Sequence, residues 1–430
     1  MVEMKKINLM MTSLAALLMA GCSQNEVTDI SPDAHPQVGF SVYTGNSTRG
    51  VDMTTASMQD DPDDADKYGG FGIYAYFTGQ QTFDQVKTDV TPSFMHNQMV
   101  KWDGTLNSGT GGWTYTPVKY WPNRPNDKIS FFAYAPYESD WENGTKVGAV
   151  GSAAAAKGIP YLSFSLKDKD NLKKMVDLVV ANNLDQTYTS VNGGKVSFQF
   201  EHTLSRISFK AQLGDGDFSG MDGKKSFVYI THMWIVGTDH SANGSNLSLI
   251  DPAAPANAGS KFYTKAKWSE LHWNYGSSDA TIPTADFSLD NILNVDAGIT
   301  ESNPTGGHTG TVKGIKITKD SQTPPVSLFP DKQYLYLIPV GDNKVDPSAG
   351  SGCAKGDIKI GFHYDIVTED QTNTGQFIAS HAESVIELPA GHMKRKQSYL
   401  YTLKINLHEI KIDEAKVSPW TDTPTNVDIE

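Results

Sequence analysis

Apolar and polar residues alternate with a period of two along most of this chain, while the spacing typical of amphipathic helices is scarce. Every second side chain of a strand points to the same face, so each alternating run predicts a strand with one buried face. Turn-forming clusters such as 192–194 and 341–343 separate the runs. The apolar positions of the runs are Val38, Phe40 and Val42; Phe71, Ile73, Ala75 and Phe77; Ile129, Phe131, Ala133 and Ala135; Val196, Phe198 and Phe200; Ile207, Phe209, Ala211 and Leu213; Tyr334, Tyr336, Ile338 and Val340; Ile358, Ile360, Phe362 and Tyr364; and Tyr399, Tyr401, Leu403, Ile405 and Leu407.

Strands that bury one face and expose the other are typical of antiparallel sandwiches, so the pattern predicts an all-β fold. The chain has 430 residues, which is too long for one hydrophobic core. We therefore expect two tandem β-sandwich domains, residues 37–200 and 201–430, with a boundary placed to within about ten residues. Two short helices, at 168–175 and 285–295, are predicted as insertions.

The first residues predict an export signal. Lys5 and Lys6 precede a short apolar stretch, and the small residues Ala20 and Gly21 stand directly before Cys22. This arrangement resembles the signal of bacterial lipoproteins, in which residues 1–21 would be removed and the Cys22 sulfur would receive a diacylglycerol carrying fatty acids such as palmitate. Residues 22–36 are polar and are interpreted as a tether. The alternative is an ordinary secretory signal with an incidental cysteine.

Composition and motifs narrow the function classes. A net charge of -13 argues against nucleic-acid binding. The two cysteines exclude a disulfide-rich scaffold, and Cys353 is interpreted as an inert thiol. The sequence has no Walker A loop, nucleophile elbow or H-E-x-x-H pair, so we expect neither an enzyme nor a cofactor or metal site. The acidic run Asp60–Asp66 offers oxygens for a calcium ion but lacks the spacing of an EF-hand loop, so it is interpreted as solvated, with calcium binding as the alternative.

A segment rich in aromatic residues offers a candidate ligand patch. Trp268, Trp273 and Tyr275 lie in a polar stretch, and exposed aromatic rings beside amides and acids often hold sugar faces. The competing interpretation is that these rings pack in the core.

Several motifs occur in a set order along the chain. They are Thr48-Arg49, Tyr120-Trp121-Pro122, Ile129–Pro136, Val176–Ala181, Phe200–Phe209, Tyr399–Ile405 and Val417–Trp420. Together with the lipoprotein signal, they resemble the fimbrillin-like lipoproteins of Bacteroidales, the subunits of type V pili. The resemblance implies two transthyretin-like sandwiches, export to the outer membrane and assembly into a fimbria (pilus).

The resemblance also implies an assembly mechanism. An extracellular arginine-directed protease would cut between Arg49 and Gly50 and release the first strand, which carries Val38, Phe40 and Val42. A C-terminal strand of a neighbouring subunit would then fill the open groove. In this chain the candidate donor strand carries Ile410, Ile412, Val417 and Trp420; the alternative is that it completes its own domain.

Two functions are therefore weighed. The first is a structural or adhesive subunit of a cell-surface fimbria, with other fimbrial subunits and a host or bacterial surface ligand as partners, and with a lipid anchor in the outer membrane before processing. The alternative is a non-polymerising surface lipoprotein that binds glycans through Trp268, Trp273 and Tyr275.

Overall fold

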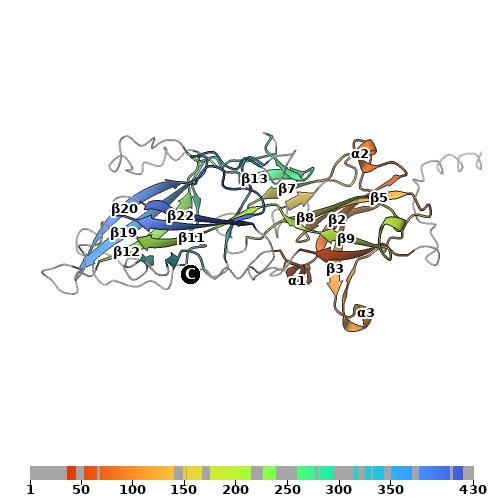
Figure 1. Cartoon of the computed structure of the whole chain (residues 1–430), viewed down its shortest axis with the longest axis horizontal. Coiled ribbons are helices and arrows are strands. Elements are labelled where there is room, and N and C mark those ends of the chain that lie inside the picture. The colour runs from red at the N-terminus through yellow and green to blue at the C-terminus, as the bar shows by residue number, and fades with distance from the viewer. Residues whose placement is uncertain are drawn as a thin grey trace, which may run out of the picture.

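The structure is a computed structural model that describes residues 36–44, 53–64, 68–139, 149–151, 153–166, 175–214, 226–238, 259–276, 279–294, 314–317, 325–330, 333–342, 350–369, 377–406 and 410–419. Figure 1 shows an elongated molecule whose strands gather in two lobes, the earlier strands in one and the later strands in the other. Within the described residues the helices are single short turns: α1 (Thr55–Met58), α2 (Phe83–Val86), α3 (Leu106–Gly109) and the 3-10 turn η3 (Tyr188–Ser190). The predicted all-β class is confirmed.

The N-terminal lobe is built on a six-stranded antiparallel sheet. Its order is β10-β8-β5-β2-β3-β4. The bounds are β2 (Phe71–Gly79), β3 (Met95–Asp103), β4 (Gly112–Thr114), β5 (Lys128–Ala135), β8 (Val179–Gln186) and β10 (Glu201–His202). A separate two-stranded sheet, β1 (Gly39–Tyr43) and β9 (Lys195–Gln199), packs on one face of this sheet. The chain's first strand therefore contributes to the core of this lobe.

The central strands of this sheet bury both of their faces. On one face, Phe71 and Phe131 contact the rings of β1 and β9. On the other, the buried Tyr76 packs against Phe83 of α2 and Phe132 of β5. Large aromatic residues thus occupy positions that strict alternation would assign to solvent, and the lobe has two hydrophobic layers.

A four-stranded sheet joins segments that are far apart in the sequence. Its order is β14-β13-β7-β6, with bounds β6 (Ala149–Gly151), β7 (Tyr161–Ser165), β13 (Lys265–Ser269) and β14 (His272–Asn274). Its strands come from both sides of residue 200, the predicted boundary. The division of the chain into domains 37–200 and 201–430 therefore stays a prediction.

The C-terminal lobe is a sandwich of two five-stranded sheets. In the first, β17-β11-β21-β22 run in order and β18 also pairs with β11; in the second, β15-β12-β19-β20 run in order and β16 also pairs with β12. Phe209 of the first sheet meets Phe362 of the second with ring centroids 6.4 Å apart. The bounds are β11 (Ser205–Leu213), β12 (Ser226–Ile235), β15 (Phe287–Ser288), β16 (Ile315–Ile317), β17 (Val326–Ser327), β18 (Leu335–Leu337), β19 (Lys359–Glu369), β20 (Phe377–Glu387), β21 (Gln397–Ile405) and β22 (Ile410–Pro419).

Two details differ from the sequence-based expectations. β1 pairs with β9 and β11 pairs with β21 in parallel, because alternation reports which face is buried and not the direction of the neighbouring strand. The helix expected at 285–295 is wrong in its described part, where β15 and a turn lie instead. The helix expected at 168–175 falls almost entirely outside the described residues.

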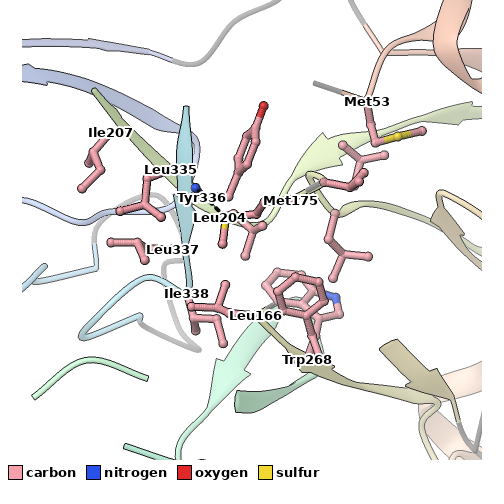
Figure 2. Packing of buried hydrophobic residues seen from close by; sticks show 14 of the residues in the cluster. Met53, Leu166, Met175, Leu204, Ile207, Trp268, Leu335, Tyr336, Leu337 and Ile338 are labelled. Carbon is pink, nitrogen blue, oxygen red and sulfur yellow. Dashed lines mark hydrogen bonds between the residues drawn. The ribbon is translucent and has the colours of Figure 1, made fainter. Parts of the chain in front are cut away.

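The chain length predicts separate cores, but buried side chains from both lobes form one connected cluster. Figure 2 shows Leu166, Met175 and Trp268 close to the segment Leu335–Ile338 of the C-terminal lobe. The backbone N–H of Tyr336 lies 3.2 Å from the Met175 sulfur, and the Trp273 Nε1–H donates to the Thr203 carbonyl at 2.7 Å. Packing across the lobes thus extends beyond the connecting backbone.

Among the residues that the structure describes, no helix has the length and apolar character needed to cross a bilayer.

Candidate functional site: the first strand and its groove

The strand β1 is held by a backbone ladder along one side. Gly39 to Tyr43 pair in parallel with Lys195 to Gln199. The Gly39 N–H donates to the Gly194 carbonyl at 3.0 Å, and the Phe200 N–H donates to the Tyr43 carbonyl at 2.8 Å. The strand therefore behaves as an added edge of a small sheet, which it shares only with β9 among the described strands.

Side chains of β1 alternate strictly between core and solvent. Val38 and Phe40 are buried, Phe40 being 5% exposed, and Val42 is half-buried against the same core. Ser41 and Tyr43 point the other way, and the Ser41 hydroxyl lies 2.6 Å from the Ser197 hydroxyl at the surface. The three apolar positions that the sequence assigned to a removable strand thus share the buried face.

Phe40 occupies a pocket made of four aromatic rings. Its ring centroid lies 5.4 Å from Tyr115, 5.7 Å from Phe198 in a stacked arrangement, 6.1 Å from Phe131 and 6.2 Å from Phe71. The last two rings stand edge-on to Phe40, an arrangement that favours aromatic pairs beyond the area they bury. Three of the four rings come from the different strands β9, β5 and β2, so the pocket exists only once the lobe has folded.

The segment 115–121 forms a second wall at the start of the strand. The Val38 N–H donates to the Lys119 carbonyl at 2.9 Å, and the Tyr115 hydroxyl donates to the Val38 carbonyl at 2.7 Å. Burial raises the pKa of Tyr115, so its hydroxyl stays protonated and remains a donor. The fully buried Trp121 donates its Nε1–H to the Gly194 carbonyl at 2.9 Å and its backbone N–H to the Pro36 carbonyl at 3.2 Å. β1 thus starts in a groove between β9 and this wall.

At its end the strand is clasped to the start of the next element. The Thr55 N–H donates to the Thr44 hydroxyl at 2.6 Å, the Thr44 N–H donates to the Thr55 hydroxyl at 3.2 Å, and the two hydroxyl oxygens are 2.9 Å apart. The intervening segment carries the proposed cleavage site, Arg49 and Gly50, which lies outside the described residues. The clasp therefore joins two described residues that lie on either side of the proposed cut in the sequence.

The strand could be predicted from the sequence, but the residues that surround it could not. Phe71, Phe131 and Phe198 appear in alternating runs, which indicates that they are buried but not that they meet around Phe40. The segment 115–121 shows no alternation of apolar and polar residues. It holds β1 through individual hydrogen bonds, which leave no periodic pattern in the sequence. The position of such a wall depends on tertiary structure alone.

The candidate donor strand lies in the sheet of its own lobe. β22 pairs antiparallel with β21 from Ile410 to Pro419, at the edge of the sheet. Ile410 is buried and Ile412 half-buried, while Val417 is 48% exposed. Trp420 lies outside the described residues. In the single chain the described part of this segment thus pairs within the sheet of its own lobe, and its later half is less covered than its start. Its role as a donor strand stays a prediction.

The candidate ligand patch is largely buried. Trp268 and Trp273 are only 6% and 1% exposed, and their rings contact each other at 5.4 Å. The guanidinium of Arg395 lies over the Trp268 ring at 5.0 Å, and the Tyr275 hydroxyl donates to the Pro339 carbonyl at 2.6 Å. The expectation that these tryptophans form an exposed platform for sugars is wrong, because both rings are used to join the hairpin β13–β14 to the rest of the fold.

One cleft reaches the buried aromatic residues near this hairpin. Tyr74 of β2, Tyr161 of β7 and Trp268 of β13 line it, and its interior measures about 30 Å³. That space is enough for a water molecule. The cleft adds no sugar-sized surface to the two tryptophans.

The acidic run is described only in part. Asp60 to Asp64 form a turn, in which the Asp63 N–H donates to the Asp61 carboxylate at 3.0 Å, and residues 65 and 66 lie outside the described residues. Within the part of the chain that the structure describes, no group of three or more His, Cys, Asp or Glu residues is placed to hold a metal ion.

The structure describes only one of the two cysteines. Cys22, the proposed lipidation site, lies outside the described residues. Cys353 is buried, and its Sγ lies 3.3 Å from the Pro389 carbonyl oxygen. Burial raises the pKa of the Cys353 thiol, which favours the unreactive protonated form.

Comparison with known proteins identifies the family to which this chain belongs. Residues 54–266 match the fimbrillin-like family. The chain is 32% identical over 424 residues to fimbrium subunit Fim1C of Phocaeicola vulgatus, with 97% of each chain covered. A fimbrial protein from Bacteroides vulgatus, known from its crystal structure, superposes with a TM-score of 0.66 at 28% identity, covering 90% of this chain and 99% of that one. With two lobes of β-sheets and near-complete coverage of a fimbrium subunit, this chain belongs to the fimbrillin-like family.

Proposed function

We propose that the chain is a structural or adhesive subunit of a cell-surface fimbria that assembles by exchange of its first strand. The observation that carries this proposal is the position of β1. It is the first described strand, it pairs with β9 alone among the described strands, and it places Phe40 in a pocket of four rings. Its loss would leave unpaired backbone groups along β9 and an apolar groove. A strand from another subunit would pair with those backbone groups and fill the groove with its apolar side chains.

The route to the surface follows from the N-terminal residues. Removal of residues 1–21 and acylation of Cys22 would anchor the precursor in the outer membrane through its lipid, with 22–36 as a tether. Two or more acyl chains are needed for stable membrane attachment, and a lipoprotein anchor supplies them. The partners at the surface are then other subunits of the same or a related type and a host or bacterial surface ligand.

Cleavage between Arg49 and Gly50 would separate β1 from the body of the protein. The Thr44–Thr55 clasp and the ladder to β9 still hold the strand after the cut, so its release is a second, slower step. The incoming strand needs alternating apolar side chains, one of them large enough to fill the pocket of Phe40. A candidate donor is the segment with Ile410, Ile412, Val417 and Trp420, which would have to leave β21, beginning at its more exposed later half.

The experiment is cleavage of the purified precursor by an arginine-specific endopeptidase. The expected products are a body that begins at Gly50 and ladders that resist SDS without heating. Arg49→Ala should abolish both, while Arg124→Ala, which removes an exposed arginine of the described body, should leave both unchanged. Ladders from Arg49→Ala at the wild-type rate would reject this cleavage site, and a released strand without ladders would reject the exchange.

A further inference from the structure

Arginine is rare in this chain. Of its 36 basic residues only four are arginines, namely Arg49, Arg124, Arg206 and Arg395, and the other 32 are lysines. The last three arginines lie in the described residues. We propose that the folded body is closed to arginine-specific endopeptidases, meaning that they do not cut it after an arginine. In this proposal Pro125 prevents the cut after Arg124, the exposed arginine of this body. The inference rests on the proposed processing at Arg49, whose specificity it explains.

Arg395 is closed by burial. Its side chain is clamped between Trp268 and Asp342, with the guanidinium Nε 3.9 Å from the Asp342 carboxylate and Nη1 donating to the Leu271 carbonyl at 2.6 Å. The residue is 7% exposed. The bond that would be cut is also fixed, because the Lys396 N–H donates to the Leu204 carbonyl at 3.1 Å. A protease cannot reach this arginine without opening the junction between the lobes.

Arg206 is closed by its place within a sheet. It lies in β11, paired with Tyr336 of β18 on one side and with Ser398 of β21 on the other. Its Nε donates to the Ser398 hydroxyl at 3.0 Å, and its guanidinium covers the Tyr334 ring at 4.3 Å. An endopeptidase binds its substrate as an added strand, and a strand with neighbours on both sides has no free backbone for this.

Arg124 has neither form of protection, since it is exposed in the loop between Trp121 and β5. The next residue is Pro125. The nitrogen of an Arg–Pro bond is tertiary and enclosed in a ring that fixes φ, so it neither donates to the enzyme nor leaves with the geometry of an ordinary amide. The Asp127 N–H also donates to the Arg124 carbonyl at 3.0 Å, which holds the bond in a tight turn with proline at its favoured second position.

The protected Arg124–Pro125 bond follows closely after one wall of the β1 groove. Arg124 follows the wall segment 115–121 by three residues, and Trp121 at the end of that wall bonds to both Pro36 and Gly194. A cut after Arg124 would free one end of the wall at the stage when the groove must receive a new strand. Protection of this bond therefore keeps the groove intact during processing.

The body is not protected against proteases in general. Lys157 and Lys355 are exposed in loops, and each is followed by a glycine with positive φ, Gly158 and Gly356. Accessible loops of this kind are common sites of proteolytic nicking. The closure is therefore specific to arginine, and a lysine-specific endopeptidase provides the matched comparison.

The test is time-resolved digestion of the full chain, with products identified by intact mass and N-terminal sequencing. With the arginine-specific enzyme we expect a single new N-terminus at Gly50, whereas the lysine-specific enzyme should cut the body. Pro125→Ala should be cut after Arg124 at least tenfold faster than the wild type. The double variant Arg124→Lys with Pro125→Ala should lose this cut, and thermal unfolding of each variant verifies the fold.

The outcomes separate the two proposals. Cuts of the wild-type body after Arg124, Arg206 or Arg395 at the rate of the N-terminal cut would overturn the closure, whatever happens to β1. A folded Pro125→Ala that resists as the wild type does would overturn the role of Pro125. An intact body with no cut at Arg49 would support the closure and refute the proposed processing.

Discussion

Phe40→Ala tests whether β1 belongs to the core of the N-terminal lobe. The substitution empties a pocket lined by Tyr115, Phe71, Phe131 and Phe198, with ring centroids between 5.4 and 6.2 Å from that of Phe40. Removal of a buried phenylalanine side chain costs about 3–5 kcal/mol of unfolding free energy, depending on how far the site collapses. Three of these rings lie on separate strands, which limits collapse, so we expect the upper half of this range.

The matched control is Ser41→Ala on the opposite face of the same strand. Ser41 contributes one exposed hydroxyl contact, to Ser197 at 2.6 Å. Its loss should cost about 1 kcal/mol or less. Both variants leave the ladder to β9 in place, so their difference isolates the contribution of the buried face.

The assay is chemical denaturation of the uncleaved protein, followed by tryptophan fluorescence. Trp121 and Trp113 lie near the pocket, with ring centroids 6.2 Å from Phe131 and 5.0 Å from Phe71, and should report on this lobe. A difference between Phe40→Ala and Ser41→Ala of less than about 1 kcal/mol would refute the packing argument, because a core phenylalanine costs several times more. After cleavage, Phe40→Ala should also release β1 faster, by two orders of magnitude or more, since each 1.4 kcal/mol is about tenfold.

Three further predictions concern single contacts. Trp273→Phe should lower the free energy of unfolding by about 1–3 kcal/mol, because the buried Thr203 carbonyl loses its 2.7 Å donor; denaturant unfolding measures this, and a loss within error would contradict it. Thr55→Val should speed release of the cleaved strand several-fold by removing the side-chain half of the clasp to Thr44, as gel filtration of the released peptide would show; an unchanged rate would assign the clasp no role. The Cys353 thiol should react with iodoacetamide at pH 8 far more slowly in the native than in the unfolded protein, because burial raises its pKa, and equal rates by mass spectrometry would count against this environment.

The all-β class and the apolar face of β1 could be read from the sequence, because a period of two reports directly which positions a strand buries. Val38, Phe40 and Val42 lie where that period puts them. Strand direction could not be read in this way: β1 and β9 run parallel although each alternates like a strand of an antiparallel sheet. Direction is set by the connections and by long-range packing.

For the aromatic residues the sequence left two interpretations open, and the structure supports core packing for Trp268 and Trp273. Trp268 and Trp273 stand in a polar stretch, yet both are buried because strands from distant segments and Arg395 cover them. The alternation of Phe71, Ile73, Ala75 and Phe77 predicts that Tyr74 and Tyr76 face solvent, yet both are buried, because a second layer covers their face of the sheet. Local pattern cannot reveal a covering layer that comes from elsewhere in the chain.

The two hydrophobic layers of the N-terminal lobe affect how long an opened subunit survives. Loss of β1 would uncover the face with Phe71 and Phe131, but the opposite face, with Tyr76 against Phe83 and Phe132, keeps its cover. The central strands also keep their mutual hydrogen bonds. A subunit waiting at the cell surface for its neighbour would therefore be incomplete rather than unfolded, and assembly could proceed at the pace at which subunits arrive.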